Sequence, residues 1–248
     1  MNTVPNVDDR QGIAPARAAS VQKYARVAGV LFLLSIAAGF FGEVYVPSKL
    51  IVSADAAATA RNITTNNSLF RLGFAIYLVE ALCDTALALI LYVLLKPVVK
   101  SLALLSAFFG LISTALYAVA ELFYFAASLI VGGADYLKTF SPDQLNTLAL
   151  LSLKVFGHGA GIFMVFYGVA SVLRGYLIFR SGFLPRFLGV LLMLAGLGFI
   201  TKNFALVLAP AYASDVLLLP MFLAVVSLTV WLLVRGVDVP KWEAKAQQ

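Results

Sequence analysis

Hydrophobic residues run along this chain in six long stretches, and polar residues gather between them. Each stretch is about 20 residues or longer, which is the length that an α-helix needs to cross the hydrocarbon core of a membrane. A transmembrane β-barrel would instead show short segments of alternating residues. The pattern therefore predicts an all-α fold, a six-helix transmembrane bundle. The expected spans are residues 27–46, 72–95, 102–131, 148–173, 187–208 and 216–234.

The segments on either side of the transmembrane domain, residues 27–234, are polar. Residues 1–26 contain two prolines and four basic residues, so we expect a disordered basic N-terminal tail, and residues 235–248 should form a polar C-terminal tail. Pro47 is expected to end the first span. In the loop that follows, an Ala-rich segment predicts a short surface helix with Ser53 as its N-cap.

Charge and composition support the membrane assignment. Of all residues, 62% are hydrophobic and 12% are charged, against roughly a quarter charged in soluble domains. The net charge of +6 could indicate nucleic acid, but the basic residues lie at the ends of the spans, as in the positive-inside pattern. We expect the lipid bilayer, and no nucleic acid, as a partner. Twelve loop Lys and Arg residues fall on the side of both termini and five on the other, which predicts cytoplasmic termini.

Several kinds of chemistry find little support in the sequence. Cys83 and His158 are the only cysteine and the only histidine, which excludes a zinc site of several such ligands within one chain, and we expect no metal and no cofactor. The Gly-rich run at 157–161 lacks the strand context of a phosphate-binding loop. No nucleophile motif accompanies the acidic residues, so no catalytic residue is assigned. The sequence leaves open whether the protein is an enzyme and favours a protein that is not one.

Ionisable residues nevertheless lie inside the spans, where a charge costs a few kcal/mol. A rise of about 1.5 Å per residue places all of them in the outer half of the membrane, with Glu43 nearest the surface. Glu80 and Asp84 project from one face of their helix because they are four residues apart. The predicted intramembrane polar cluster, a candidate binding site or proton pathway, comprises Glu80, Asp84, Glu121, Lys154, His158 and Lys202.

Two helix faces should support this cluster. Thr114, Tyr117, Tyr124 and Ser128 share a face with Glu121, and their hydroxyl groups need protein partners rather than lipid. On the fourth span, small residues form a packing groove that includes Gly157, Gly161 and Gly168. Such a groove suits a neighbouring helix of the same chain or of a second copy, so a homo-oligomer is compatible with it.

The polar cluster has two interpretations. In the first, it is a pocket open to the outer side that binds a small solute or passes protons or cations, and the protein is a transporter. In the second, Lys154 and Lys202 pair with two of the carboxylates in a buried structural network. The protein is then a non-catalytic structural or regulatory membrane component. The sequence leaves both interpretations open.

Five segments carry a resemblance to a known family. They are Arg26-x-Ala28-Gly29, SADAAATARNI at 53–63, FRLG at 70–73, LYVLLKP at 91–97 and, above all, GYLIFRSGFLPRFLGVLL at 175–192. The chain resembles, from about residue 25 to 235, the bacterial membrane proteins of domain-of-unknown-function family 4386. The resemblance implies a multi-pass protein of the bacterial cytoplasmic (inner) membrane. It implies no activity and assigns a role to no residue.

Overall fold

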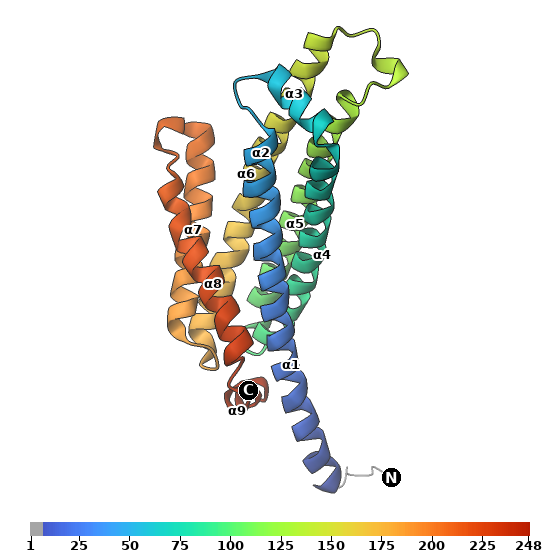
Figure 1. Ribbon diagram of the computed structural model, residues 1–248. Helices are drawn as coiled ribbons and strands as arrows, with labels where there is room; N and C mark the ends of the chain where they lie inside the picture. Colours follow the sequence, from blue (N-terminus) through green and yellow to red (C-terminus); the bar gives the residue numbers. More distant parts are fainter. Residues whose placement is uncertain (1–6) are drawn as a thin grey trace. The chain divides into compact units, whose positions relative to one another are not determined.

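The computed structural model describes residues 7–248, with side chains from residue 19 onward, and this part of the chain contains helices and no strand (Figure 1). The elements are α1 (Val7–Gly39), a π-helical segment (Phe40–Tyr45), α2 (Val46–Leu50), α3 (Ala56–Thr65), α4 (Asn67–Leu95), α5 (Lys100–Ile130), α6 (Pro142–Ser181), α7 (Arg186–Leu208), α8 (Leu219–Val234) and α9 (Val239–Ala246). Short 3-10 turns, at Asp135–Leu137, Pro210–Tyr212 and Asp215–Leu218, complete the list. The all-α prediction is confirmed.

Six helical stretches in the described residues are long and apolar enough to cross a membrane, which confirms the predicted number of spans. They are Ala19–Leu50, Asn67–Leu95, Lys100–Ile130, Pro142–Ser181, Arg186–Leu208 and Asp215–Val234. The fourth stretch is much longer than expected. It begins at Pro142, where the Ser141 side chain accepts from the Gln144 amide, and it ends at Ser181, before Gly182 takes a positive φ of 74°.

The first span differs from the prediction at both ends. Helix α1 is continuous from Val7, and Val21 and Ala25 are buried, so residues 7–26 are helical where a disordered tail is expected; residues 1–6 lie outside the described part. For residues 21–26 the reason is packing, because the buried apolar face of α1 already begins at Val21. Pro47 does not end the span, since it occupies the first turn of α2, where a proline is tolerated.

Helix α3 confirms that the Ala-rich segment is helical, but its N-cap differs from the prediction. Asp55, rather than Ser53, is the capping residue: its carboxylate accepts from the Ala58 amide at 2.8 Å. The helix begins two residues later than a Ser53 cap would require, because Thr59 forms hydrogen bonds with the turn that precedes it. The Thr59 hydroxyl accepts from the Val52 amide at 2.9 Å, which holds Val52–Asp55 in a turn.

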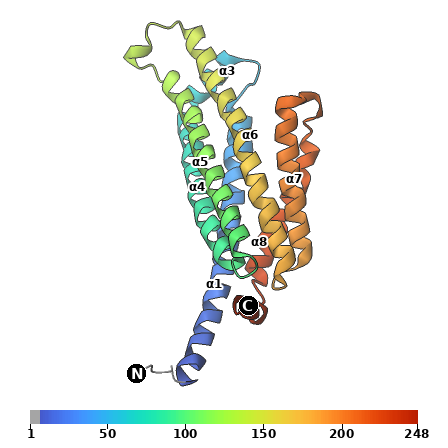
Figure 2. The same cartoon turned by 180° about the vertical axis from the view of Figure 1, so that it is seen from behind.

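The chain forms two compact units, each with its own core. Among the described residues, unit 1 contains 7–32, 86–109 and 168–248, and unit 2 contains 33–85 and 110–167. In unit 1, α7 and α8 lie side by side, as both views show (Figure 2). The largest fully buried side chains of this unit are Leu94, Leu95, Leu177, Ile178, Leu188 and Leu232.

Small residues join α6 to α7 in unit 1. A Cβ atom at Gly168 would lie 2.8 Å from the Gly196 carbonyl oxygen, and one at Gly175 would lie 2.6 Å from the Gly189 oxygen. The two backbones therefore approach too closely for any side chain at these positions. This is the predicted packing groove at Gly168. Gly157 takes no part in it, because it is exposed and a Cβ there would have no neighbour within 4 Å; Gly161 is half-buried.

The segment predicted as a polar tail contains α9, which packs against other helices of unit 1. Asp238 caps it, and the hydrogen bond from the Lys241 ammonium lowers the pKa of this carboxyl. Trp242 is 3% exposed, and its indole N–H donates to the Leu94 carbonyl at 2.8 Å. That carbonyl belongs to the last turn of α4, where carbonyl groups lack partners within the helix. Helix α9 thus caps the end of α4.

Replacing Trp242 with phenylalanine is expected to lower the free energy of unfolding by about 1–3 kcal/mol, because the Leu94 carbonyl then stays buried without a donor. Thermal unfolding of the purified protein in detergent measures the change. Trp231, which is half-buried, provides the matched control: Trp231→Phe should leave stability nearly unchanged. Equal effects of the two substitutions would contradict the capping role.

Candidate functional site

Three tyrosines occupy the centre of unit 2. Tyr77 of α4 and Tyr117 and Tyr124 of α5 are 0%, 4% and 1% exposed. The Tyr77 ring meets the other two edge to face, with centroids 5.8 Å from Tyr117 and 5.3 Å from Tyr124. Phe156 of α6 lies against all three rings. These four rings fill the space between the helices of the unit.

Each of the three hydroxyl groups has a defined acceptor on another helical segment. Tyr77 donates to the Gly42 carbonyl at 2.6 Å, and Tyr124 donates to the Phe70 carbonyl at 3.2 Å. Tyr117 donates to the Glu43 carboxylate at 2.8 Å. The first two bonds fasten the backbones of neighbouring segments, whereas the third reaches an acidic side chain inside the first span.

The Gly42 carbonyl is available to Tyr77 for a backbone reason. The Val46 amide, its ordinary α-helical donor, bonds instead to Phe41, as the π-helical geometry requires. The next candidate donor would be Pro47, which has no N–H. Gly42 must also be glycine, because a Cβ atom there would lie 2.8 Å from the Tyr77 ring. Gly42 and Pro47 together therefore leave a carbonyl group free and close enough for the Tyr77 hydroxyl to bond to it.

Glu121 is the most unusual residue of the site. It is 1% exposed, and neither of its carboxyl oxygens has a hydrogen-bond partner in the described part of the chain. Oε2 of Glu80 is likewise buried without a partner, while its Oε1 approaches α1 at Gly39. Among residues 19–248, neither glutamate takes part in an ion pair. A buried charged carboxylate without a partner costs several kcal/mol or more, so each group must take up a proton or a cation.

Asp84 and Glu43 extend the row of acids. The Ser35 hydroxyl donates to Asp84 Oδ1 at 3.0 Å, and Glu43, which is exposed, accepts from Tyr117. Ser35, Gly39 and Glu43 follow one another at steps of four along the first span. This face of the first span therefore meets the acidic face of α4. We name the acids Glu43, Glu80, Asp84 and Glu121, with Tyr77, Tyr117 and Tyr124, the carboxyl–tyrosine cluster.

The basic residues predicted for the cluster lie elsewhere. Lys202, in unit 1, pairs with Asp215 at 2.6 Å, so its predicted pairing with Glu80, Asp84 or Glu121 is wrong. Lys154 is exposed and forms no ion pair within the described residues. His158 is exposed too, with Nδ1 2.8 Å from the Lys154 carbonyl oxygen. The cause is the orientation of α6. Lys154 and His158 lie outside its inward face, which consists of Ala149, Ser152, Leu153 and Phe156.

The predicted stripe on α5 is largely buried, as expected. Tyr117, Glu121, Tyr124 and Ser128 are all less than 9% exposed. Thr114 is half-buried and donates only to Gly110 of its own helix, and Ser128 donates to Phe125. Sequence reasoning missed Tyr77 and Ser35. Tyr77 precedes Glu80 by three residues, and this spacing is the signal that could have identified it.

The described part of the chain holds no group of three or more His, Cys, Asp or Glu side chains arranged as ligands for one metal ion. The four acids of the cluster come from three helical segments and meet tyrosine and serine hydroxyls. Carboxyl and hydroxyl oxygens are hard ligands that can exchange protons or contact a small cation.

Comparison with known proteins gives a family and one similar relative. A family model, described as a domain of unknown function (DUF4386), matches residues 27–236. An uncharacterised protein of Archaeoglobus fulgidus is 26% identical over 158 residues, which is 62% of this chain and 76% of that relative. No solved structure matches the chain.

Proposed function

Because the chain belongs to the DUF4386 family and has six helices able to cross a membrane, we propose that it is a proton or small-cation transporter. Its carboxyl–tyrosine cluster is the site at which the ion binds within the membrane. The protein resides in the cytoplasmic membrane of a bacterium with both termini in the cytoplasm, and the cluster lies in the outer half of the bilayer. Reporter fusions at each terminus test this orientation.

The buried carboxyl of Glu121 is the observation that carries the proposal. A purely structural role would supply this group with a hydrogen-bond donor or a basic partner, and neither is present within the described residues. Ionisable groups inside spans commonly mark ion and proton paths, because burying such a group in the membrane costs free energy that a structural role does not require. Glu121 therefore supports a role in binding and releasing a positive ion.

The packing around the cluster favours a small ion over a larger solute. The rings of Tyr77, Tyr117, Tyr124 and Phe156 are in mutual contact at centroid distances of 5.3 to 6.3 Å. Such packing suits a proton or a dehydrated monovalent cation held by carboxyl and hydroxyl oxygens. Glu43 is the acid of the cluster that accepts from Tyr117, and Tyr117 connects it to the buried rings.

The alternative is a structural or regulatory membrane component without transport activity. It is supported by the bonds from Tyr77 to Gly42 and from Tyr124 to Phe70, which fasten neighbouring segments whatever the cluster does. The two functions predict different behaviour for Glu121. A structural residue contributes to stability, whereas an ion-binding residue contributes to ion movement.

Ion flux in reconstituted vesicles separates the two functions. Purified protein is placed in liposomes that contain a pH-sensitive dye, and a pH gradient is imposed in sodium, potassium or choline buffer. We expect flux with the wild type and only the background of protein-free vesicles with Glu121→Gln. Asp143→Asn, which removes an exposed acid at the start of α6, is the control and should retain full flux. The same vesicles are tested for uptake of radioactive sodium and rubidium, and wild-type protein that gives neither a dye response nor cation uptake above the protein-free background would refute transport.

A further inference from the structure

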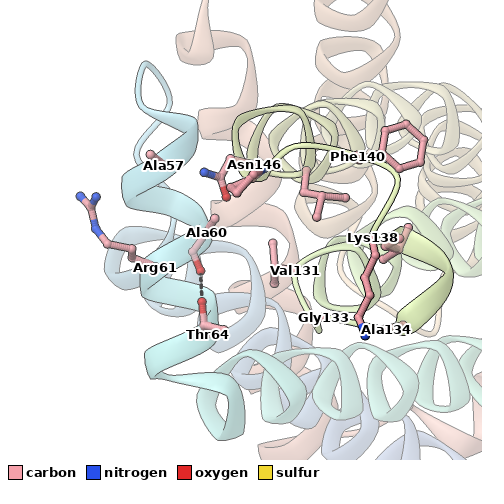
Figure 3. Close-up of a pocket in the computed structure, with 13 residues that line it drawn as sticks. Ala57, Ala60, Arg61, Thr64, Val131, Gly133, Ala134, Lys138, Phe140 and Asn146 are labelled. Atoms are coloured by element: carbon pink, nitrogen blue, oxygen red, sulfur yellow. Dashed lines mark hydrogen bonds between the residues drawn. The ribbon is translucent and has the colours of Figure 1, made fainter.

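A cavity of about 440 Å³ lies in unit 2, between α3, the loop that follows α5 and the start of α6 (Figure 3). Its volume falls in the range of roughly 300–1,000 Å³ that is typical of small-molecule sites. No residue of the carboxyl–tyrosine cluster lines it. The cavity is therefore a separate feature of the protein.

The position of the cavity places it at the membrane surface. Helix α3 connects the span that ends at Leu50 with the span that begins at Asn67, and the loop after Ile130 connects two further spans. Segments between the ends of transmembrane helices lie at the boundary between lipid and water. Molecules with an apolar tail and a polar head concentrate at this boundary.

The lining of the cavity has two kinds of surface. Val131, Leu137, Phe140 and Leu145 provide apolar walls, whereas two cationic side chains, Arg61 and Lys138, are the charged lining residues. No acidic residue lines the cavity. This combination is complementary to a molecule with a negative head and an apolar tail, and it disfavours a cation.

Both basic groups are available to a ligand. Lys138 pairs with Asp135 at 2.6 Å, but the two side chains are 74% and 90% exposed, and an ion pair of this kind contributes only about 0–1 kcal/mol. Arg61 is exposed and forms no ion pair in the described part of the chain. Figure 3 shows its guanidinium directed away from the centre of the cavity. Exposed side chains change rotamer in picoseconds to nanoseconds, so Arg61 can turn toward a bound anion.

We propose that this cavity binds an anionic amphiphile. Arg61 and Lys138 hold its phosphate or carboxylate head, and the apolar tail lies against Val131, Leu137 and Phe140. The ligand is either a lipid of the surrounding bilayer or a soluble amphiphile that arrives from the water, since both present the same chemistry.

Calorimetric titration of the protein in phosphatidylcholine nanodiscs with decyl phosphate tests the proposal, with empty nanodiscs subtracted. We expect saturable binding of decyl phosphate and none of inorganic phosphate, which lacks the tail. The double variant Arg61→Gln/Lys138→Gln should bind about tenfold more weakly or worse, because it loses charge-assisted hydrogen bonds. Lys241→Gln is the matched control: Lys241 pairs with Asp238 three residues before it, as Lys138 pairs with Asp135, and it lies outside the cavity.

A second titration identifies the source of the ligand. Phosphatidylglycerol added to the nanodiscs should weaken decyl phosphate binding if a bilayer lipid occupies the cavity, and should leave it unchanged if the ligand is soluble; either result agrees with an anionic amphiphile. Unchanged affinity in the double variant would overturn the proposal. Equal binding of inorganic phosphate would overturn it as well, because the apolar walls would then contribute nothing.

Discussion

Replacing Glu121 with methionine is expected to raise the free energy of unfolding by about 1–3 kcal/mol while abolishing ion movement. The gain arises because the wild-type protein buries a carboxyl whose two oxygens have no partner, at a cost of about this size. Methionine is apolar, similar in size and flexible enough to fill the same space. Unfolding in detergent micelles measures stability, and the liposome assay measures flux. Greater stability with lost function is typical of residues that evolved for activity.

Glu121→Gln is the control for this prediction, since the amide keeps the volume of glutamate but remains a buried polar group. It should lose flux without gaining stability. The structural alternative predicts the reverse for Glu121→Met, namely a loss of stability, because a network member would be removed. A destabilised methionine variant with normal flux would therefore exclude Glu121 as an ion-binding residue.

Replacing Gly189 with valine is expected to lower the free energy of unfolding by about 3 kcal/mol or more, enough to prevent accumulation of folded protein. A Cβ atom at Gly189 would lie 2.6 Å from the Gly175 carbonyl oxygen and 2.7 Å from the Phe179 amide nitrogen. Both are backbone atoms, which cannot move aside as a flexible side chain can. The yield of monodisperse protein from membranes and its thermal unfolding in detergent measure the effect.

Gly157→Val provides the control, because Gly157 is also a helical glycine but has nothing within 4 Å of its Cβ position. Valine has a higher helix propensity than glycine, so this variant should be as stable as the wild type or slightly more stable. If both valine variants were equally stable, the close approach of α6 and α7 would not be required for the fold.

The spans and the inward face of α5 could be predicted from the sequence because both depend on simple periodicity. Continuous apolar runs identify the spans, and the steps of three and four between Tyr117, Glu121 and Tyr124 leave only one face on which they can lie. The orientation of α6 could not be predicted in this way. Its small residues suggest one inward face, which includes Gly157 and Lys154, but the core of unit 2 uses the face of Leu153 and Phe156.

Contacts between side chains that lie far apart in the sequence could not be predicted either. Depth along a helix places Lys202 at the level of the acids, but depth does not distinguish Asp215, its observed partner, from Glu80 or Glu121. The alignment of Ser35 with Asp84 also depends on contacts that no local pattern encodes. The predicted N-cap of α3 is wrong for a simpler reason. Ser53 and Asp55 are both good capping residues, and tertiary contacts select Asp55.

The π-helical segment at Phe40–Tyr45 acts as a rotational spacer in the first span. Its wider turn holds one residue more than an α-helical turn, and each residue of an α-helix corresponds to about 100° of rotation. If this segment tightened to α-helical geometry, the Val46 amide would bond to the Gly42 carbonyl, which Tyr77 now occupies alone. The preceding part of the helix would then rotate and carry Ser35 away from Asp84. The extra residue of the π-helical turn thus belongs to the register in which Ser35 faces Asp84 and the Gly42 carbonyl faces Tyr77.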